Sequence, residues 1–203
     1  MINPEVNQIL NEFESMRKRM KNPPKKKSNR DFVGHVFATI ALKHMATHIS
    51  SQYNVVSGPL WIQGLEWIEW DGAVIRSGSK EIFENYHNPQ NVVALFELKS
   101  GGIYGRKSPQ KGKGRTLQEV IDGIRRNFCE AGKICPNLKR CFYVSLHERK
   151  PKRKDSINYY GETKKLEPKI VTCILFESSS LEKKRPLPFN GEWDRLAVEL
   201  KNL

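Results

Sequence analysis

The run from Asn91 to Leu98 constrains the fold of this chain more than any other segment. Its residues are mostly β-branched, aliphatic or aromatic, which is the composition of a central β-strand. The fully apolar stretch at its centre is followed by two charged residues, Glu97 and Lys99. Unpaired charge at the end of a core strand is costly. The position of these two side chains therefore makes them candidates for a functional role.

Hydrophobic periodicity predicts one domain preceded by a basic arm. Apolar residues at three- and four-residue steps predict helices over 4–20, 31–49, 117–128 and 192–200. Alternating or continuous apolar runs predict strands over 53–56, 65–75, 91–98, 140–146 and 170–176. This order predicts an α/β or α+β fold with a mixed central β-sheet flanked by helices. We divide the chain into an N-terminal helix with a basic arm, 1–30, and one domain, 31–203.

The chain carries a large excess of positive charge. It has 35 Lys and Arg against 22 Asp and Glu, a formal net charge of +13 over 203 residues. Such an excess favours polyanions, with nucleic acid first and an anionic membrane surface second, although many basic proteins have neither partner. The longest apolar runs fall far short of the roughly 20 residues of a membrane span. The first residues do not have the pattern of a signal peptide.

The cysteines point to a reducing compartment. Cys129, Cys135, Cys141 and Cys173 form no C-x-x-C pair, and no paired histidines follow at zinc-ligand spacing. Cys141 and Cys173 lie in apolar runs, where a free thiol packs as a small hydrophobic group. We expect all four to be reduced and structural, in a cytoplasmic protein.

Asp71, Glu97 and Lys99 form the sharpest constellation in the sequence. Side chains alternate across a strand, so Glu97 and Lys99 project from the same face of one strand. If the strand containing Asp71 pairs with it as a hairpin, two carboxylates and one ammonium converge. Adjacent carboxylates repel unless a cation intervenes, and Mg²⁺ is a hard cation that takes oxygen ligands and acidifies bound water. The carbonyl of Leu98, between the two charged residues, is a further candidate ligand.

Trp70-Asp71 followed by Glu97-Leu98-Lys99, after a leading helix, resembles the signature of the PD-(D/E)xK nuclease superfamily. The resemblance spans roughly residues 31–176, and Trp70 replaces the usual proline. It implies a restriction-endonuclease-like core that hydrolyses phosphodiester bonds with Mg²⁺, for which Mn²⁺ can substitute. It also implies that Asp71 and Glu97 bind the metal and that Lys99 is catalytic. The simpler interpretation is the exposed end of a core strand next to an Asp-Gly turn.

Additional metal ligands are expected from acidic or imidazole side chains. Many members of the superfamily add a carboxylate, and the candidates are Glu12, Glu14, Asp31 and Glu69. Glu69 lies two residues before Asp71 and would share its strand face, whereas a solvated helix face explains Glu12 and Glu14 better. The viral cap-snatching endonucleases, which this chain also resembles in size and motif order, use a helix histidine. The candidates are His35, His44 and His48, although a helix histidine is more often structural.

Two basic segments are expected to contact nucleic acid. The segment after Lys99 combines glycines, which permit close approach to a phosphate, with cationic side chains. The later segment interleaves cations with aromatic residues that could stack on bases. The candidate nucleic-acid-binding residues are Arg106, Lys107, Lys111, Lys113, Arg115, Lys152, Arg153 and Lys154. The alternatives are a solvated loop and a surface insertion.

Together these features predict an Mg²⁺-dependent endonuclease, with a DNA enzyme of restriction or defence type favoured. One alternative is a nucleic-acid-binding module of the same fold without catalysis. Another is an RNA endonuclease of the viral cap-snatching type. The expected partner is nucleic acid, DNA ahead of RNA, and no membrane. A homodimer stays open, because sequence-specific cutting enzymes are often dimers.

Overall fold

The computed structural model describes residues 3–19, 28–100, 117–147, 170–176 and 191–203. The helices are α1 (Pro4–Arg19), α2 (Ser28–Ala46), α3 (Leu117–Ile134) and α6 (Glu192–Lys201). The strands are β1 (Tyr53–Ile62), β2 (Trp70–Arg76), β3 (Tyr86–His87), β4 (Val92–Lys99), β5 (Arg140–His147) and β6 (Ile170–Phe176). A short 3₁₀ helix, η1 (Pro89–Asn91), leads into β4.

The strands form one mixed sheet in the order β3-β1-β2-β4-β5-β6. β1, β2 and β4 pair antiparallel, whereas β4, β5 and β6 run parallel. β3 is two residues long and pairs in parallel with the end of β1 at the edge of the sheet. β4 is therefore the strand where the antiparallel half meets the parallel half. Gly72 of β2 lies opposite Phe96 of β4, so the start of β2 lies beside the end of β4.

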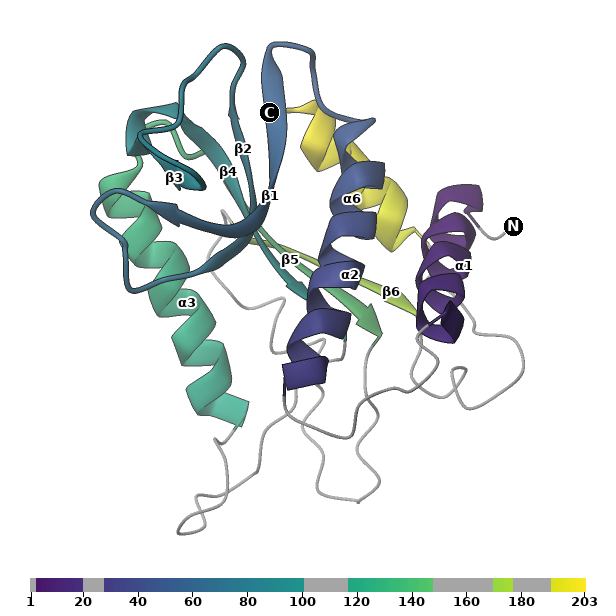
Figure 1. Ribbon diagram of the computed structural model, residues 1–203. Coiled ribbons are helices and arrows are strands. Elements are labelled where there is room, and N and C mark those ends of the chain that lie inside the picture. The colour runs from purple at the N-terminus through teal and green to yellow at the C-terminus, as the bar shows by residue number, and fades with distance from the viewer. Residues whose placement is uncertain (1–2, 20–27, 101–116, 148–169, 177–190) are drawn as a thin grey trace, which may run out of the picture.

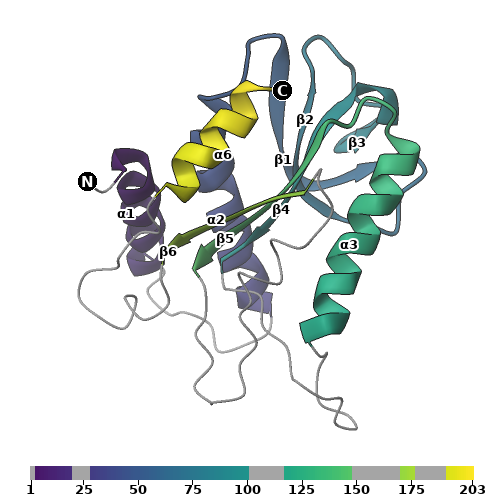
Figure 2. The same cartoon turned by 180° about the vertical axis from the view of Figure 1, so that it is seen from behind.

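Helices cover both faces of this sheet. In Figure 1, α3 lies on one face, while α1, α2 and α6 lie on the other, and the view from behind in Figure 2 shows the same division. Side chains of β4 contribute to the hydrophobic core on both faces of the sheet. Ala94, Phe96 and Leu98 belong to the core on the side of α1, α2 and α6, and Leu95 to the core under α3. Since side chains alternate along a strand, Glu97 falls on the α3 face with Leu95.

The start of β2 is fixed between the two helical layers. The ring of Trp70 stacks on Phe128 of α3, with centroids 5.6 Å apart and planes inclined by 21°. On the other side, a Cβ added at Gly72 would lie 2.6 Å from Leu42 Cδ1 of α2. Helix α2 can approach β2 this closely because residue 72 has no side chain. Asp71, between these two residues, is therefore held from both sides.

The predicted fold class is confirmed, since a mixed sheet is flanked by helices and the elements follow the predicted order. The antiparallel pairing of β2 with β4 also agrees with the prediction. The strand predicted over 65–75 is wrong in its first half, because β2 begins only at Trp70. Leu65 and Ile68 are buried although they lie outside a strand, so their apolar side chains gave the sequence the hydrophobic pattern of a strand. The turn that contains them is closed by Glu66, whose carboxylate accepts a hydrogen bond from the Gly64 amide at 2.8 Å.

Helix α1 contributes to the same core as the sheet. Val6, Ile9, Leu10 and Phe13 are buried in the cluster that also contains residues of α2, β4 and α6. The apolar positions that predicted this helix are therefore the ones that it buries. The division of the chain at residue 30 stays a prediction.

No helix in the described part of the chain is long and apolar enough to cross a membrane. The four cysteines are free thiols, and Cys135, Cys141 and Cys173 are buried. Burial raises the pKa of the Cys135 thiol to about 12, so this thiol stays protonated at neutral pH. These observations agree with cysteines that pack as small hydrophobic groups.

Candidate active site

Asp71, Glu97 and Lys99 come together where β2 begins and β4 ends. The Lys99 Nζ lies 2.5 Å from Glu97 Oε1 and 3.7 Å from Asp71 Oδ2, so one ammonium contacts both carboxylates. The two carboxylate side chains are each 21% exposed and that of Lys99 is 42% exposed. The group is therefore open to a ligand on one side. In sheets with parallel strands, ligands commonly bind at the carboxyl ends of those strands, which is where Glu97 and Lys99 lie.

Asp71 is oriented by the backbone of the neighbouring strand. The amide of Leu98 donates a hydrogen bond to Asp71 Oδ2 at 2.6 Å. A hydrogen bond to an ionised carboxylate is among the stronger ones in proteins. Leu98 therefore contributes its N–H to the group, whereas a metal-ligand role for its carbonyl stays a prediction. The Asp-Gly turn is excluded as the explanation of Asp71, because Asp71 and Gly72 lie within β2.

Charge and burial act together on this group. Burial raises the pKa of Glu97, and the charges of Asp71 and Glu69 raise it further, while the Lys99 ammonium acts in the opposite direction. Burial would lower the pKa of Lys99, but the charges of Glu97 and Asp71 outweigh it, and that pKa is raised. Lys99 therefore keeps its positive charge. That charge offsets the cost of placing two carboxylates close together in a partly buried position.

Tyr143 of β5 lies beside Glu97 and was not among the sequence-based candidates. The two residues are partners in the parallel ladder of β4 and β5, so their side chains share the α3 face. Tyr143 is buried, and burial raises the pKa of its phenol well above the ordinary value, with the charges of Glu97 and Asp71 adding to the shift. A neutral phenol thus adjoins the acidic pair. Its sequence signal is a single Tyr in an apolar strand, which does not distinguish it from core residues.

The side chains of the group are suited to binding a hard divalent cation through a small number of protein ligands. Both carboxylates already contact one cationic group, Lys99 Nζ, and carboxylate oxygens are the ligands that Mg²⁺ prefers. Mg²⁺ commonly keeps several waters and takes one or two carboxylates. No cluster of three or more His, Cys, Asp or Glu side chains suited to a metal occurs in the described ranges. Within the described residues, the oxygen ligands available to such an ion are those of Asp71 and Glu97 and backbone carbonyls, and water would complete its coordination.

Glu69, the predicted extra carboxylate, lies just before β2 and not within the strand, and its role as a metal ligand stays a prediction. It is exposed. Its negative charge is nevertheless near enough to contribute to the raised pKa of Glu97. Glu69 therefore borders the group from the turn before β2. Asp31 belongs to α2, but its side chain lies outside the part of the chain that the structure describes.

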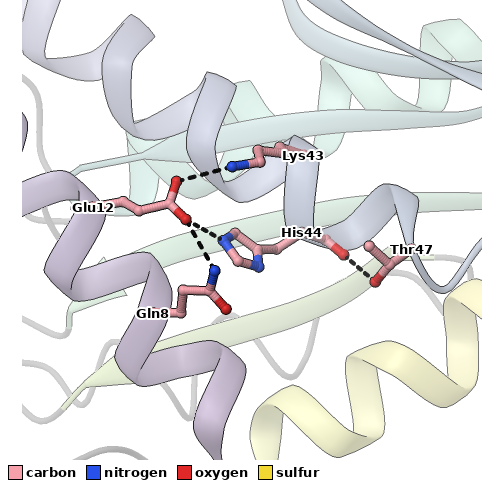
Figure 3. A network of polar contacts seen from close by, with 5 residues as sticks. All are labelled: Gln8, Glu12, Lys43, His44 and Thr47. Carbon is pink, nitrogen blue, oxygen red and sulfur yellow. Dashed lines mark hydrogen bonds and ion pairs between the residues drawn. The ribbon is translucent and has the colours of Figure 1, made fainter.

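Two of the three candidate helix histidines, His44 and His48, take part in contacts on the opposite face of the sheet. In Figure 3, His44 of α2 faces Glu12 of α1, with His44 Nε2 3.2 Å from Glu12 Oε1. The other oxygen of Glu12 lies 3.4 Å from Lys43 Nζ. Glu12 is therefore a contact between two helices rather than a solvated side chain, whereas Glu14 is exposed.

His48 makes a second contact of the same kind. Its Nε2 lies 2.8 Å from Glu5 Oε2, which also accepts a hydrogen bond from Trp193 Nε1 of α6 at 2.5 Å. Glu5 thus joins α1 to both α2 and α6. The structure does not bring His44 or His48 to Asp71 and Glu97. His35 lies nearer the start of α2 and is half-buried.

The basic segments predicted to bind nucleic acid lie outside the described residues. This applies to all eight candidates, Arg106, Lys107, Lys111, Lys113, Arg115, Lys152, Arg153 and Lys154. The first of these segments begins directly after Ser100, one residue beyond Lys99.

Comparison with known proteins identifies the fold. No family model and no curated protein matches the chain. Among solved structures, the cAAA-bound form of NucC from E. coli MS115-1 superposes with a TM-score of 0.58 at 10% identity, covering 98% of this chain and 87% of that one. The chain shares the NucC fold. The restriction-endonuclease-like core predicted from the motif is thereby confirmed as the fold class.

Two further NucC structures give the same result. The cAAA-bound form of NucC from P. aeruginosa ATCC27853 has a TM-score of 0.55 at 10% identity, with 98% of this chain and 88% of that chain covered. The apo form from E. coli MS115-1 has a TM-score of 0.50 at 11% identity, with 97% and 89% covered. Nearly the whole length of this chain therefore takes part in the similarity.

Proposed function

We propose that this chain is a metal-dependent nuclease of the PD-(D/E)xK superfamily that hydrolyses phosphodiester bonds in nucleic acid. The observation that carries this proposal is the contact of one ammonium, Lys99, with the carboxylates of Asp71 and Glu97 at the end of β4. The similarity to NucC over nearly the whole chain supports nuclease activity in general. The net charge of +13 supports a polyanionic substrate.

Each residue of the group has a role in that chemistry. A divalent cation, when bound, acidifies a water molecule and offsets negative charge on the phosphate. Asp71 and Glu97 would hold it, with the carbonyl of Leu98 as a third ligand. The Leu98 amide keeps the Asp71 carboxylate in place through a 2.6 Å hydrogen bond. Lys99 is close enough to this position to orient the attacking water or to neutralise a phosphate oxygen.

More specifically, we propose that the chain is a DNA endonuclease with a role in phage defence. The NucC structures support this choice, and the viral cap-snatching resemblance supports RNA less well, because neither His44 nor His48 reaches the acidic pair. We place the protein in the cytoplasm, where its four free thiols stay reduced. The cations outside the described residues would bind phosphates of the substrate.

The direct test is turnover of defined substrates by the purified chain. Plasmid DNA, a single-stranded oligonucleotide and an RNA of matched sequence are each incubated with Mg²⁺, with Mn²⁺ and with chelator. We expect cleavage of DNA that needs a divalent ion, and a loss of about a hundredfold or more in Glu97→Gln. The matched control is Glu130→Gln, which removes another ion-paired glutamate, on α3, and should cleave normally.

The outcomes separate the three functions. Cleavage of RNA alone would establish the RNA endonuclease instead. Binding of DNA with no cleavage under any ion would establish a non-catalytic module of the same fold. Equal loss of activity in Glu97→Gln and Glu130→Gln would remove the active-site assignment.

A further inference from the structure

Four polar side chains form one row across the face of the sheet that α3 covers, and we call them the polar row. They are Asp71 of β2, Glu97 of β4, Tyr143 of β5 and Thr172 of β6. Glu97 is the ladder partner of Tyr143, and Tyr143 is the partner of Thr172, so these three side chains share one face. Asp71 joins them because its carboxylate contacts the same ammonium as Glu97, that of Lys99.

The row next to the polar row is apolar. On the same face, two residues earlier in each of β4, β5 and β6, the ladder partners are Leu95, Cys141 and Ile170. Tyr143 is 3% exposed and Thr172 is 4% exposed, and burying a hydroxyl group is costly unless it makes a hydrogen bond. Packing alone, which apolar side chains provide in the neighbouring row, therefore does not account for two hydroxyls beside the acids.

The pairing of β4 with β5 keeps Tyr143 beside Glu97. The ladder runs over six consecutive residue pairs without a shift in register. On the other face of the sheet, the rings of Phe96 and Phe142 stack, with centroids 5.1 Å apart and planes inclined by 18°, and both rings are buried. A change of register would separate these rings and give Tyr143 a different neighbour. Packing on the opposite face therefore fixes the place of the phenol next to the acid.

The Tyr143 phenol lies within electrostatic range of both carboxylates. The charges of Glu97 and Asp71 raise its pKa in the same direction as burial does. A phenol is neutral at pH 7 and offers one O–H donor. In this structure the partner of Glu97 is the charged Lys99, at 2.5 Å. Tyr143 can thus donate a hydrogen bond to a carboxylate without adding positive charge to the group.

The difference between a charged and a neutral donor matters for metal binding. An ammonium and a divalent cation repel each other, so the contact of Lys99 with Glu97 weakens when an ion binds. Carboxylates that bind metals are usually held by hydrogen bonds from neighbouring groups, which set their orientation. Tyr143 is the neutral donor that the sheet places beside Glu97.

We propose that Tyr143 supports metal binding by donating a hydrogen bond from its hydroxyl to the Glu97 carboxylate in the ion-bound form of the site. It acts through Glu97 and contacts neither the ion nor the substrate. The inference rests on the proposed metal-dependent function, but its main measurement is ion affinity, which can be determined whether or not the chain cleaves nucleic acid. Lys99 would stabilise the acids without the ion, and Tyr143 would support Glu97 with it.

Isothermal titration calorimetry with Mn²⁺ tests the proposal on the intact chain. Tyr143→Phe removes the hydroxyl and keeps the ring, and it should bind Mn²⁺ about tenfold more weakly than wild type. The matched control is Tyr86→Phe, which removes a hydroxyl that also contacts a glutamate, Glu66, at 2.5 Å, but lies outside the polar row. The control should bind Mn²⁺ like wild type. Melting curves without metal verify that both variants are folded.

An ultraviolet difference spectrum detects the same hydrogen bond in the wild-type chain. The absorption of a phenol shifts when its hydroxyl gains a carboxylate as partner, so addition of Mg²⁺ should produce a tyrosine signal. The signal should persist in Tyr86→Phe and be absent in Tyr143→Phe. A tyrosine that only packs in the core would give no signal on addition of the ion, and that result would contradict the proposal.

The outcomes distinguish this proposal from the proposed function. Equal Mn²⁺ affinity of Tyr143→Phe and wild type would make Tyr143 a packing residue and overturn the proposal, while the function would stand. Equal loss of affinity in Tyr143→Phe and Tyr86→Phe would overturn it as well. A wild-type chain that binds no divalent ion would overturn both. A wild-type chain that binds Mn²⁺ but cleaves no nucleic acid would overturn the function alone, and the affinity of Tyr143→Phe would still decide this proposal.

Discussion

The Leu98 amide donates a hydrogen bond of 2.6 Å to Asp71 Oδ2, and this bond joins β4 to β2 at the candidate active site. The carboxylate of Asp71 is therefore oriented by the main chain of the neighbouring strand, together with the Lys99 ammonium at 3.7 Å. Glu97 and Lys99, on either side of Leu98, complete the group from the same strand. The pairing of β2 with β4 and the two contacts of Lys99 together hold the three side chains in this arrangement.

Substitution of Asp71 separates its charge from its hydrogen bond. Asp71→Asn keeps an oxygen that can accept from Leu98, and the apo protein should be within about 1 kcal/mol of wild type in unfolding free energy. Asp71→Ala leaves that amide without its partner and should cost about 1–3 kcal/mol. Urea denaturation measures both. We expect Mg²⁺ to raise the melting temperature of wild type by selective binding to the folded state, and both variants should lose that rise. An Asn variant as unstable as the Ala variant would contradict the hydrogen-bond argument.

Lys99 should compete with a metal ion for the two carboxylates. The ammonium lies 2.5 Å from Glu97 and 3.7 Å from Asp71, where it supplies the charge that a cation would supply. Lys99→Met should therefore bind Mn²⁺ more tightly than wild type, by about tenfold, while it loses cleavage by about a hundredfold. Isothermal titration calorimetry measures the affinity. Lys133→Met, on α3, is the control and should change neither quantity. Weaker metal binding in Lys99→Met would show that the lysine does not occupy the position of the ion.

Gly72 should tolerate a side chain only when Leu42 is made smaller. A Cβ at residue 72 would lie 2.6 Å from Leu42 Cδ1 and 2.9 Å from its Cδ2, in a buried position. Gly72→Ala should cost about 1–3 kcal/mol through overpacking, and Leu42→Ala about 2–5 kcal/mol through the cavity that it leaves. In the double variant the new methyl group partly fills that cavity. Thermal unfolding of all four proteins should give a double-variant loss smaller than the two single losses together, and strict additivity would contradict the close contact.

Glu5 should make the stability of the helical layer depend on pH. Burial would raise the pKa of Glu5, but the hydrogen bonds from Trp193 and His48 outweigh it, and that pKa is lowered from 4.5. A lowered carboxyl pKa contributes stability that is present above the ordinary value and is lost as pH falls through the folded-state value. Wild type should therefore lose stability below about pH 4.5 more steeply than Glu5→Gln. Urea denaturation at several pH values measures this difference. Glu14→Gln, with an exposed glutamate, should follow wild type, and identical slopes for all three would refute the assignment.

The sequence could predict the local part of the candidate site. Period-two alternation placed Glu97 and Lys99 on one strand face, and the hairpin placed Asp71 opposite, because both relationships follow from short-range geometry. Tyr143 could not be predicted in the same way. Its place beside Glu97 depends on the parallel pairing of β4 with β5, which is a choice among several sheet orders that the sequence pattern allows equally.

Sequence patterns are less informative where a local turn or the packing of two helices decides the outcome. The strand predicted from residue 65 is a turn, in which the Leu65 amide donates to the Ile62 carbonyl and the Ile68 amide to the Leu65 carbonyl, so Leu65 and Ile68 are buried without an extended chain. By sequence, His44 and His48 are either metal ligands or structural residues, and the structural interpretation is the favoured one. Their partners, Glu12 and Glu5, come from a helix whose placement against α2 depends on long-range packing.

The position of β4 between the antiparallel and parallel halves of the sheet has a consequence for which amino-acid substitutions the candidate site can accept. The acids and the lysine come from β2 and β4, which are neighbours in an antiparallel ladder formed by residues 70–99. The phenol beside them and the covering helix α3 come from beyond that ladder, through a crossover connection. Substitutions in the second set can therefore change the surroundings of the charged group while the pairing of β2 with β4 that positions it is kept. The architecture therefore separates the residues that position the charged group from the residues that pack around it.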